Sequence, residues 1–140
     1  MAENSPRISF RVSESQVEAI SKCAWECNVD VAKLVRAGIT IGLPVLIENE
    51  SAYRDEESEK LTDNISIQLD PNLELILRKT LVRRSTWKSA SIIRSSLRVA
   101  LPILRAYPVL IGHFNLRFLD VSNFMVLLDH TRASRTHLSG

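Results

Sequence analysis

The sequence predicts a mostly helical domain built around a two-stranded antiparallel ribbon, with two helices following each strand. Two short segments, residues 7–12 and 64–69, alternate apolar and polar side chains as half-buried strands do. Each is followed by two stretches with apolar residues at helical spacing. Because a single short strand has no sheet of its own to join, each copy is the expected partner of the other.

The two halves of the chain also match residue by residue, which indicates an internal duplication. The strands align at an offset of 57 positions and the second helices at an offset of 58. Small residues recur four positions apart in both second helices, which predicts that these helices cross closely. The matched positions include Ile8 with Ile65, Ser9 with Ser66, Arg36 with Arg94, Gly38 with Ser96, Gly42 with Ala100, and Pro44 with Pro102.

Capping residues occur where each apolar stripe starts, so local chemistry predicts the helix boundaries. Asn28 suits the left-handed position that ends a helix. Ser85 or Thr86 is expected to end the third helix and begin the fourth. Pro44 predicts a kink or a final turn late in the second helix. The expected N-caps are Ser13 with Gln16 three residues later, Asp30, and Asp70 followed by Pro71.

Composition and charge divide the chain into four parts. Residues 1–47 and 64–108 are the two repeats, expected to share one core; residues 48–63 are an acidic linker, and residues 109–140 a C-terminal helical extension with a polar tail. The linker holds seven acidic and two basic side chains, whereas residues 64–140 hold eleven basic and four acidic ones. No acid stands between Glu74 and Asp120. A cationic stretch of this length favours an anionic partner, although solvated cationic helix faces are also common.

Several classes of protein are not expected. The chain lacks an apolar run of about 18 residues and a secretory signal, so we expect a cytoplasmic protein with no membrane partner. Cys23 and Cys27 are expected to be free thiols in the core, because no His or Cys pair accompanies them at metal-ligand spacing. No nucleophile motif or phosphate loop is present. We therefore expect no catalytic residues, no metal and no cofactor, that is, no enzyme.

A strand, a capped helix, a turn and a second helix within residues 7–47 resemble the ribbon-helix-helix family of DNA-binding proteins (MetJ/Arc type). The resemblance rests on Ile8, Phe10, Val12, Ser13, Val17, Ile20, Asn28, Asp30, Leu34 and Gly38 in the first copy, and on Leu69, Asp70, Pro71, Leu73, Leu77, Thr86 and Ile92 in the second. In that family two chains pair their strands into a ribbon that enters the major groove. With both copies present, this chain resembles a single-chain pseudo-dimer.

The tandem arrangement is similar to the TraY-type accessory proteins of conjugative plasmid relaxosomes. Tyr107 and Pro108, just after the fourth predicted helix, resemble the end of their repeats. The resemblance covers the two repeats and the linker, and the segment after Tyr107 has no counterpart in it. It implies binding to bacterial nucleoid or plasmid DNA.

The polar face of the predicted ribbon carries side-chain types that recognise bases. Arginine pairs well with guanine, and Asn or Gln with adenine, in the major groove. The two strands carry different sets, which predicts an asymmetric, non-palindromic site. A merely solvated sheet face is the plainer alternative, which the wholly apolar opposite face disfavours. The expected base-reading residues are Arg7, Ser9, Arg11, Asn64, Ser66 and Gln68.

Phosphate contacts are expected at the starts of the second helix of each copy, where free amide groups attract anions. Asp30 places a like charge at the first of these starts, so the second copy is expected to anchor more strongly. The expected phosphate-binding residues are Lys33 in the first copy and Arg83, Arg84, Thr86, Lys88 and Ser89 around the second.

The leading hypothesis is sequence-specific binding of double-stranded DNA, as a relaxosome accessory factor or a transcriptional regulator. The alternative from another class is a protein-interaction module, antitoxin-like or a scaffold, that uses the apolar helical pattern of residues 110–128. A third interpretation has that segment pack on the fold or join two copies of the chain.

Overall fold

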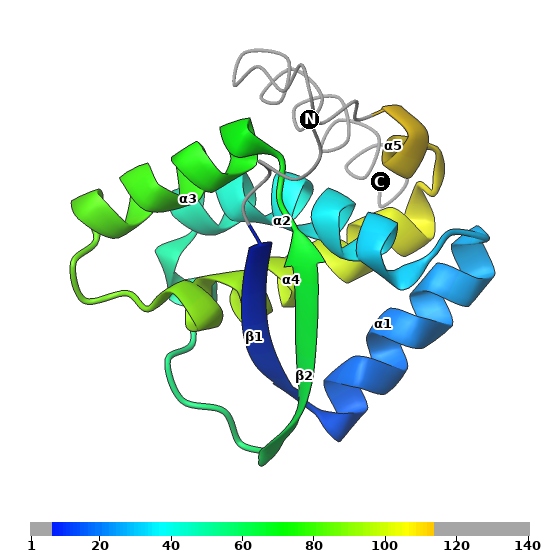
Figure 1. Ribbon diagram of the computed structural model, residues 1–140, viewed down its shortest axis with the longest axis horizontal. Coiled ribbons are helices and arrows are strands. Elements are labelled where there is room, and N and C mark those ends of the chain that lie inside the picture. The colour runs from blue at the N-terminus through cyan, green and yellow to red at the C-terminus, as the bar shows by residue number, and fades with distance from the viewer. Residues whose placement is uncertain (1–6, 114–140) are drawn as a thin grey trace, which may run out of the picture.

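The structure, a computed structural model, describes residues 7–113, which form a mostly helical body with one two-stranded antiparallel ribbon (Figure 1). In chain order the elements are β1 (Arg7–Ser13), α1 (Glu14–Cys27), α2 (Val31–Glu48), the short 3₁₀ helix η2 (Glu50–Ala52), β2 (Leu61–Gln68), α3 (Pro71–Arg83), α4 (Ser89–Ala106) and α5 (Val109–His113). The predicted order of a strand followed by two helices thus occurs twice. No helix among residues 7–113 is long and apolar enough to cross a membrane.

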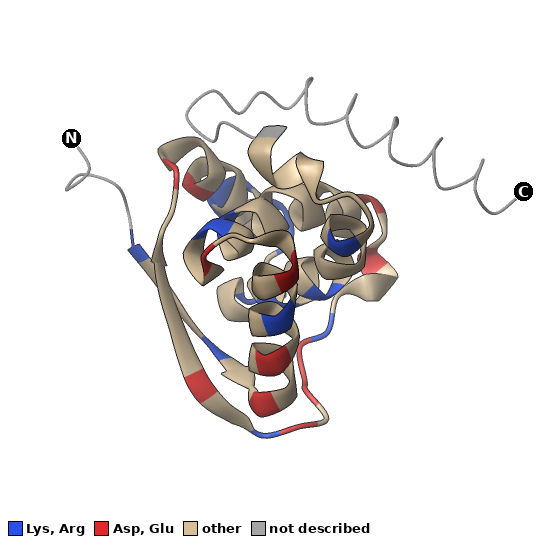
Figure 2. Cartoon of the chain, turned by 90° about the vertical axis from the view of Figure 1, so that its right-hand side faces the viewer, with Lys and Arg blue, Asp and Glu red and all other residues tan. Residues whose placement is uncertain are grey.

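The two strands pair with each other, as the repeat predicted. Ser9 lies opposite Ser66 at the middle of the antiparallel ribbon. β2 begins at Leu61, earlier than predicted, because the end of β1 pairs with residues 61 and 63 across an irregularity in the register. Figure 2 shows the ribbon beside the helices, which lie on one side of it and leave its other face open.

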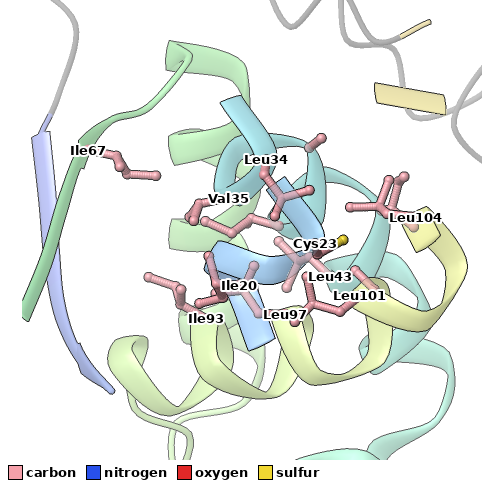
Figure 3. Close-up of a cluster of buried hydrophobic side chains, with 14 of the residues drawn as sticks. Ile20, Cys23, Leu34, Val35, Leu43, Ile67, Ile93, Leu97, Leu101 and Leu104 are labelled. Carbon is pink, nitrogen blue, oxygen red and sulfur yellow. The ribbon is translucent and has the colours of Figure 1, made fainter. Parts of the chain in front are cut away.

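The inner face of the ribbon closes the hydrophobic core. Phe10, Val12 and Ile67 are buried, because alternate strand residues point toward the helices. Figure 3 shows the core side chains that α1, α2 and α4 contribute, including Leu43 and Leu97. Burial of each such side chain stabilises the fold by about 1.5–3 kcal/mol. The ribbon is therefore held by packing on one face only.

The close crossing predicted from the small residues is present between α2 and α4. A Cβ atom added to Gly42 would lie 2.0 Å from the carbonyl oxygen of Ser96, so the helix backbones almost touch there. A Cβ atom added to Gly38 would lie 2.6 Å from a methyl group of Leu97 and 3.9 Å from the Cβ of Ala100. Glycine is required at position 42 because the Ser96 backbone cannot move aside, whereas the end of the Leu97 side chain opposite Gly38 can.

Local capping explains most of the helix boundaries. Ser13 accepts a hydrogen bond from the Gln16 amide at 3.2 Å, and Asp70 accepts one from the Asn72 amide at 2.7 Å. Asn28 ends α1 in the left-handed conformation, with φ of 57°. Asp30 caps α2 through the amide of Lys33. These caps were all predicted from the sequence, and the structure confirms them.

The start of α4 was predicted wrongly. The helix begins at Ser89, later than the expected cap at Ser85 or Thr86, and its N-cap residue Lys88 makes no side-chain capping bond. The Lys88 amide instead donates to the hydroxyl of Tyr53, from the predicted linker, at 3.0 Å. A residue far away in the sequence thus contributes to this boundary, and local capping signals do not contain that information.

The predicted apolar segment 110–128 is described only at its beginning. Leu110 and Ile111 are buried, and α5 contacts both α2 and α4. This short part packs on the fold, as the third interpretation of the segment expected. Residues 114–128 lie outside the described residues, so the wider hypotheses about that segment stay predictions.

Candidate nucleic-acid interface

The outward face of the ribbon carries all six residues expected to contact bases. Arg7, Ser9, Arg11, Asn64 and Gln68 are exposed, and Ser66 is half-buried. The register places Arg7 opposite Gln68 and Arg11 opposite Asn64, on either side of the central serine pair. Each end of the ribbon therefore presents one guanidinium group from β1 and one amide group from β2. The sequence alone could not show this distribution, because it depends on the register.

Hydrogen bonds organise the middle of this face. The Ser9 hydroxyl donates to the Ser66 hydroxyl at 3.1 Å, and Arg7 Nε donates to the same Ser66 oxygen at 2.9 Å. Neither Arg7 nor Arg11 makes an ion pair with an acid in the part of the chain that the structure describes. Both arginines therefore carry uncompensated positive charge on an exposed face.

The two helix starts that were expected to bind phosphate have different surroundings. At α2, the Asp30 carboxylate accepts the Lys33 amide at 2.7 Å, while the Lys33 side chain is exposed. At α4, Lys88 Nζ lies 3.5 Å from the Asp55 carboxylate. Arg83 and Thr86 are exposed and Ser89 is half-buried. The α4 start is thus already in contact with an acid of the chain itself.

Arg84 is also engaged. Its guanidinium group donates to Glu50 Oε1 at 2.9 and 2.6 Å and to the carbonyl oxygen of Ile47 at 3.3 Å. The same group lies 5.1 Å from the centre of the Trp87 ring, within range of a cation–π contact. Its side chain is only 20% exposed. A phosphate contact through Arg84 would therefore require these bonds to open.

The predicted linker is an ordered part of the fold. Residues 49–60, which we call the acidic strap, run along α4 and attach to it at successive points. Tyr53 stacks on Trp87 with ring centres 4.4 Å apart and planes 4° from parallel. Asp55 accepts the Ser91 hydroxyl at 3.3 Å. Glu57 accepts two bonds from Arg98, at 2.7 and 2.8 Å.

The strap supplies acidic partners to the cationic stretch between Glu74 and Asp120, which has no acid of its own in the sequence. Arg84, Lys88, Arg94 and Arg98 all pair with acids of the strap. These four side chains therefore do not form a free cationic surface. Lys79 and Arg83 on α3 make no ion pair within residues 7–113 and remain exposed. The sequence did not predict the strap, because its charges were assigned to a linker rather than to the helix opposite.

The strap ends at the beginning of α1. The Glu59 carboxylate accepts hydrogen bonds from the hydroxyl groups of Ser15 and Ser13, which lower the pKa of Glu59 below its usual value. A carboxylate whose pKa is lowered in the folded state contributes stability at neutral pH, and that contribution is lost as the pH falls through the lowered pKa.

Arg94 joins the strap to the ribbon. Its side chain donates to the carbonyl oxygen of Arg11 at 2.9 Å, to Glu57 at 3.2 Å and to the Ser91 hydroxyl at 3.2 Å. The residue is only 5% exposed. A buried guanidinium requires partners of this kind, because an unpaired buried charge is strongly unfavourable. Arg94 thus fixes the backbone of β1 directly beneath the exposed Arg11 side chain.

Other residues noted in the sequence have structural surroundings. Cys23 lies in the core, where burial, followed by the neighbouring Cys27, raises the pKa of its thiol to about 11, so the thiol is protonated. Trp87 contacts both Tyr53 and Arg84. Trp25, by contrast, is 83% exposed at the end of α1.

Comparison with protein-family models, with curated proteins and with solved structures finds no match for this chain. What the protein does must therefore follow from its own residues and their arrangement.

Proposed function

We propose that this protein binds double-stranded DNA sequence-specifically, with the open face of the β1–β2 ribbon in the major groove. A two-stranded ribbon has the width that this groove admits. The observation that carries the proposal is the pairing of one arginine with one amide side chain at each end of the face, Arg7 with Gln68 and Arg11 with Asn64. Both arginines are exposed and free of acidic partners within the described residues.

The helix contacts support a single-chain pseudo-dimer of the ribbon-helix-helix kind. Gly38 aligns with Ser96, and Gly42 with Ala100, at the repeat offset of 58. The Gly42–Ser96 contact and the Gly38–Ala100 contact are therefore counterparts. Reciprocal contacts of this kind are what a two-fold axis between the repeats would produce. The same axis would pass between Ser9 and Ser66 in the ribbon.

The register refines the expected target. A two-fold axis would exchange Arg7 with Asn64 and Arg11 with Gln68. The two half-sites are then contacted by the same two kinds of side chain in exchanged positions. We therefore propose an asymmetric, non-palindromic site, with guanine and adenine contacts in both halves but in exchanged order. In the cell, the role would be that of a relaxosome accessory factor or a transcriptional regulator.

Selection from a random duplex pool at low salt tests this proposal. We expect one enriched motif, with binding that weakens steeply as salt rises. Arg11→Ala is expected to cost about 1–3 kcal/mol and to relax the base preference in one half of the motif. Gln68→Ala, at the other end of the ribbon, should relax the other half.

Lys22→Ala is the matched control, because Lys22 is an exposed cation on α1, an element outside the ribbon. Its removal should leave the motif unchanged. Absence of any enriched motif with the wild-type protein would reject DNA recognition and favour the protein-interaction hypothesis. Equal effects of Arg11→Ala and Lys22→Ala would reject base contacts by the ribbon.

A further inference from the structure

The acidic strap places a carboxylate where the proposed function expects a DNA phosphate. The Tyr53 hydroxyl accepts a hydrogen bond from the Lys88 amide at 3.0 Å. The Asp55 carboxylate lies 3.5 Å from Lys88 Nζ and accepts a hydrogen bond from the Ser91 hydroxyl at 3.3 Å. An amide, an ammonium group and a hydroxyl are the groups that bind phosphate at a helix start. In this protein all three already have partners from residues 53–55.

Within residues 7–113, the counterpart position at α2 has no segment like the strap over it. There the cap is Asp30, from the residue just before the helix, and Lys33 is exposed without an ion pair in the described chain. In Figure 1 α2 and α4 run in opposite directions behind the ribbon and begin on opposite sides of it. The two starts therefore flank the ribbon, and only one of them is covered by the strap.

We propose that residues 53–55 of the strap compete with DNA for the start of α4, and that a backbone phosphate displaces the Asp55 carboxylate when DNA binds. This inference rests on the proposed DNA binding and concerns its regulation. The covered state disfavours binding to arbitrary sequences. Base contacts by the ribbon then supply the additional free energy that releases the strap.

The strength of the strap contacts indicates where release occurs. Asp55 and Lys88 have side chains 42% and 72% exposed, and an ion pair this exposed is weak and easily exchanged. Glu57 and Arg94 have side chains only 11% and 6% exposed, and Arg94 also donates a hydrogen bond to the Arg11 carbonyl oxygen. Glu57 is therefore the firmer anchor, and the exposed Asp55–Lys88 pair is where release would begin. Full release of residues 53–55 would also open the bond from the Arg54 amide to the buried Ser95 hydroxyl, at 3.0 Å.

A pair of neighbouring charge changes tests the competition. Asp55→Asn and Glu56→Gln each remove one negative charge, but the exposed Glu56 makes no ion pair or hydrogen bond within residues 7–113. If Asp55 competes with phosphate, Asp55→Asn should raise DNA affinity about two- to fivefold, the range expected for an exposed ion pair. Glu56→Gln should raise it clearly less, through general charge alone.

Equal gains from the two variants would overturn the proposal, because they would show a charge effect without a specific contact. A lower affinity of Asp55→Asn would overturn it too. If wild-type and both variants bind no duplex, the proposed function itself fails, which is a different result.

Fluorescence gives a second and independent measurement. Trp87 stacks on Tyr53, so in a Trp25→Phe background, where Trp87 is the only tryptophan, its emission reports on the strap. Saturating specific duplex should change that emission, and the change should be much smaller when Tyr53→Ala is added. An unchanged emission on saturation, or the same change with and without Tyr53, would overturn strap release.

Discussion

Arg36 and Arg94 stand at equivalent positions of α2 and α4, 58 residues apart, but their surroundings differ. Arg94 is 5% exposed and bonds to Arg11, Glu57 and Ser91. Arg36 is half-buried, and its guanidinium group makes no ion pair or hydrogen bond within residues 7–113. The same residue type, at the matching position, is a buried connector in one half and a half-buried side chain without such partners in the other.

The difference follows from the path of the chain. The strap has to lead from the end of α2 to the start of β2, and it makes its contacts along α4. It brings acids to Lys88, Arg94 and Arg98, whereas within residues 7–113 no acid forms an ion pair with Lys33 or Arg36, the basic residues of α2. In the proposed pseudo-dimer, joining two copies in one chain would keep the shared crossing and the ribbon nearly symmetric, while the outer faces become different.

The largest expected effect concerns the shared crossing. In Gly42→Ala the new methyl group would collide with the Ser96 backbone, which neither helix can relieve without moving. We expect a loss of about 3 kcal/mol or more in the free energy of unfolding, the upper range for overpacking. Urea or thermal unfolding measures it.

Gly38→Ala is the matched control for this prediction. Its methyl group would come too close only to the end of the Leu97 side chain, which can shift more easily than backbone, and would lie at ordinary contact distance from Ala100. Alanine also favours the helix over glycine by about 1 kcal/mol. The net change should therefore stay within about 1 kcal/mol. Equal losses for the two variants would contradict the close backbone contact at Gly42.

The second-largest effect compares the stability contributions of Arg94 and Arg36. Arg94→Ala removes the bonds to the Arg11 carbonyl and to Ser91 and weakens the attachment of Glu57. Loss of one partner from a buried charged network should cost about 3 kcal/mol. Arg36→Ala, on the more exposed side, should cost less than about 1 kcal/mol. Chemical denaturation of both variants compares them, and similar values would refute the distinct role of Arg94.

Much of the fold was predictable because its signals are local. Alternation marked both strands, and the side chains of Ser13, Asp30 and Asp70 marked helix starts that the structure confirms. The small residues at Gly38 and Gly42 marked the crossing. The polar face of the ribbon was predictable too, since it follows from the period of two.

The remainder depends on contacts between distant residues. The start of α4 involves Tyr53, 35 positions before Lys88, so the local hydroxyl residues suggested the wrong boundary. The opposition of Arg7 and Gln68 required the strand register. The sequence did not predict the strap, because its charges are mixed, with Arg54 and Lys60 among the acids. Such a pattern has no period that identifies a partner helix. Positive charge counted along the sequence therefore overstated the free cationic surface.

The smallest expected effect compares the two helix starts directly. Asp30→Ala removes the side chain that caps α2 and should cost about 1 kcal/mol, with faster hydrogen exchange at the Lys33 amide. Asp30→Ser keeps an oxygen that can accept the same bond, so its stability should stay within about 0.5 kcal/mol of wild type.

At α4 the corresponding change is Tyr53→Phe, which keeps the ring stack and removes the oxygen that accepts the Lys88 amide. If exchange at Lys88 rises in Tyr53→Phe while Lys33 is unaffected, the two starts are capped independently, one by its neighbour and one by the strap. Unchanged exchange at Lys88 would show that the strap does not cap α4.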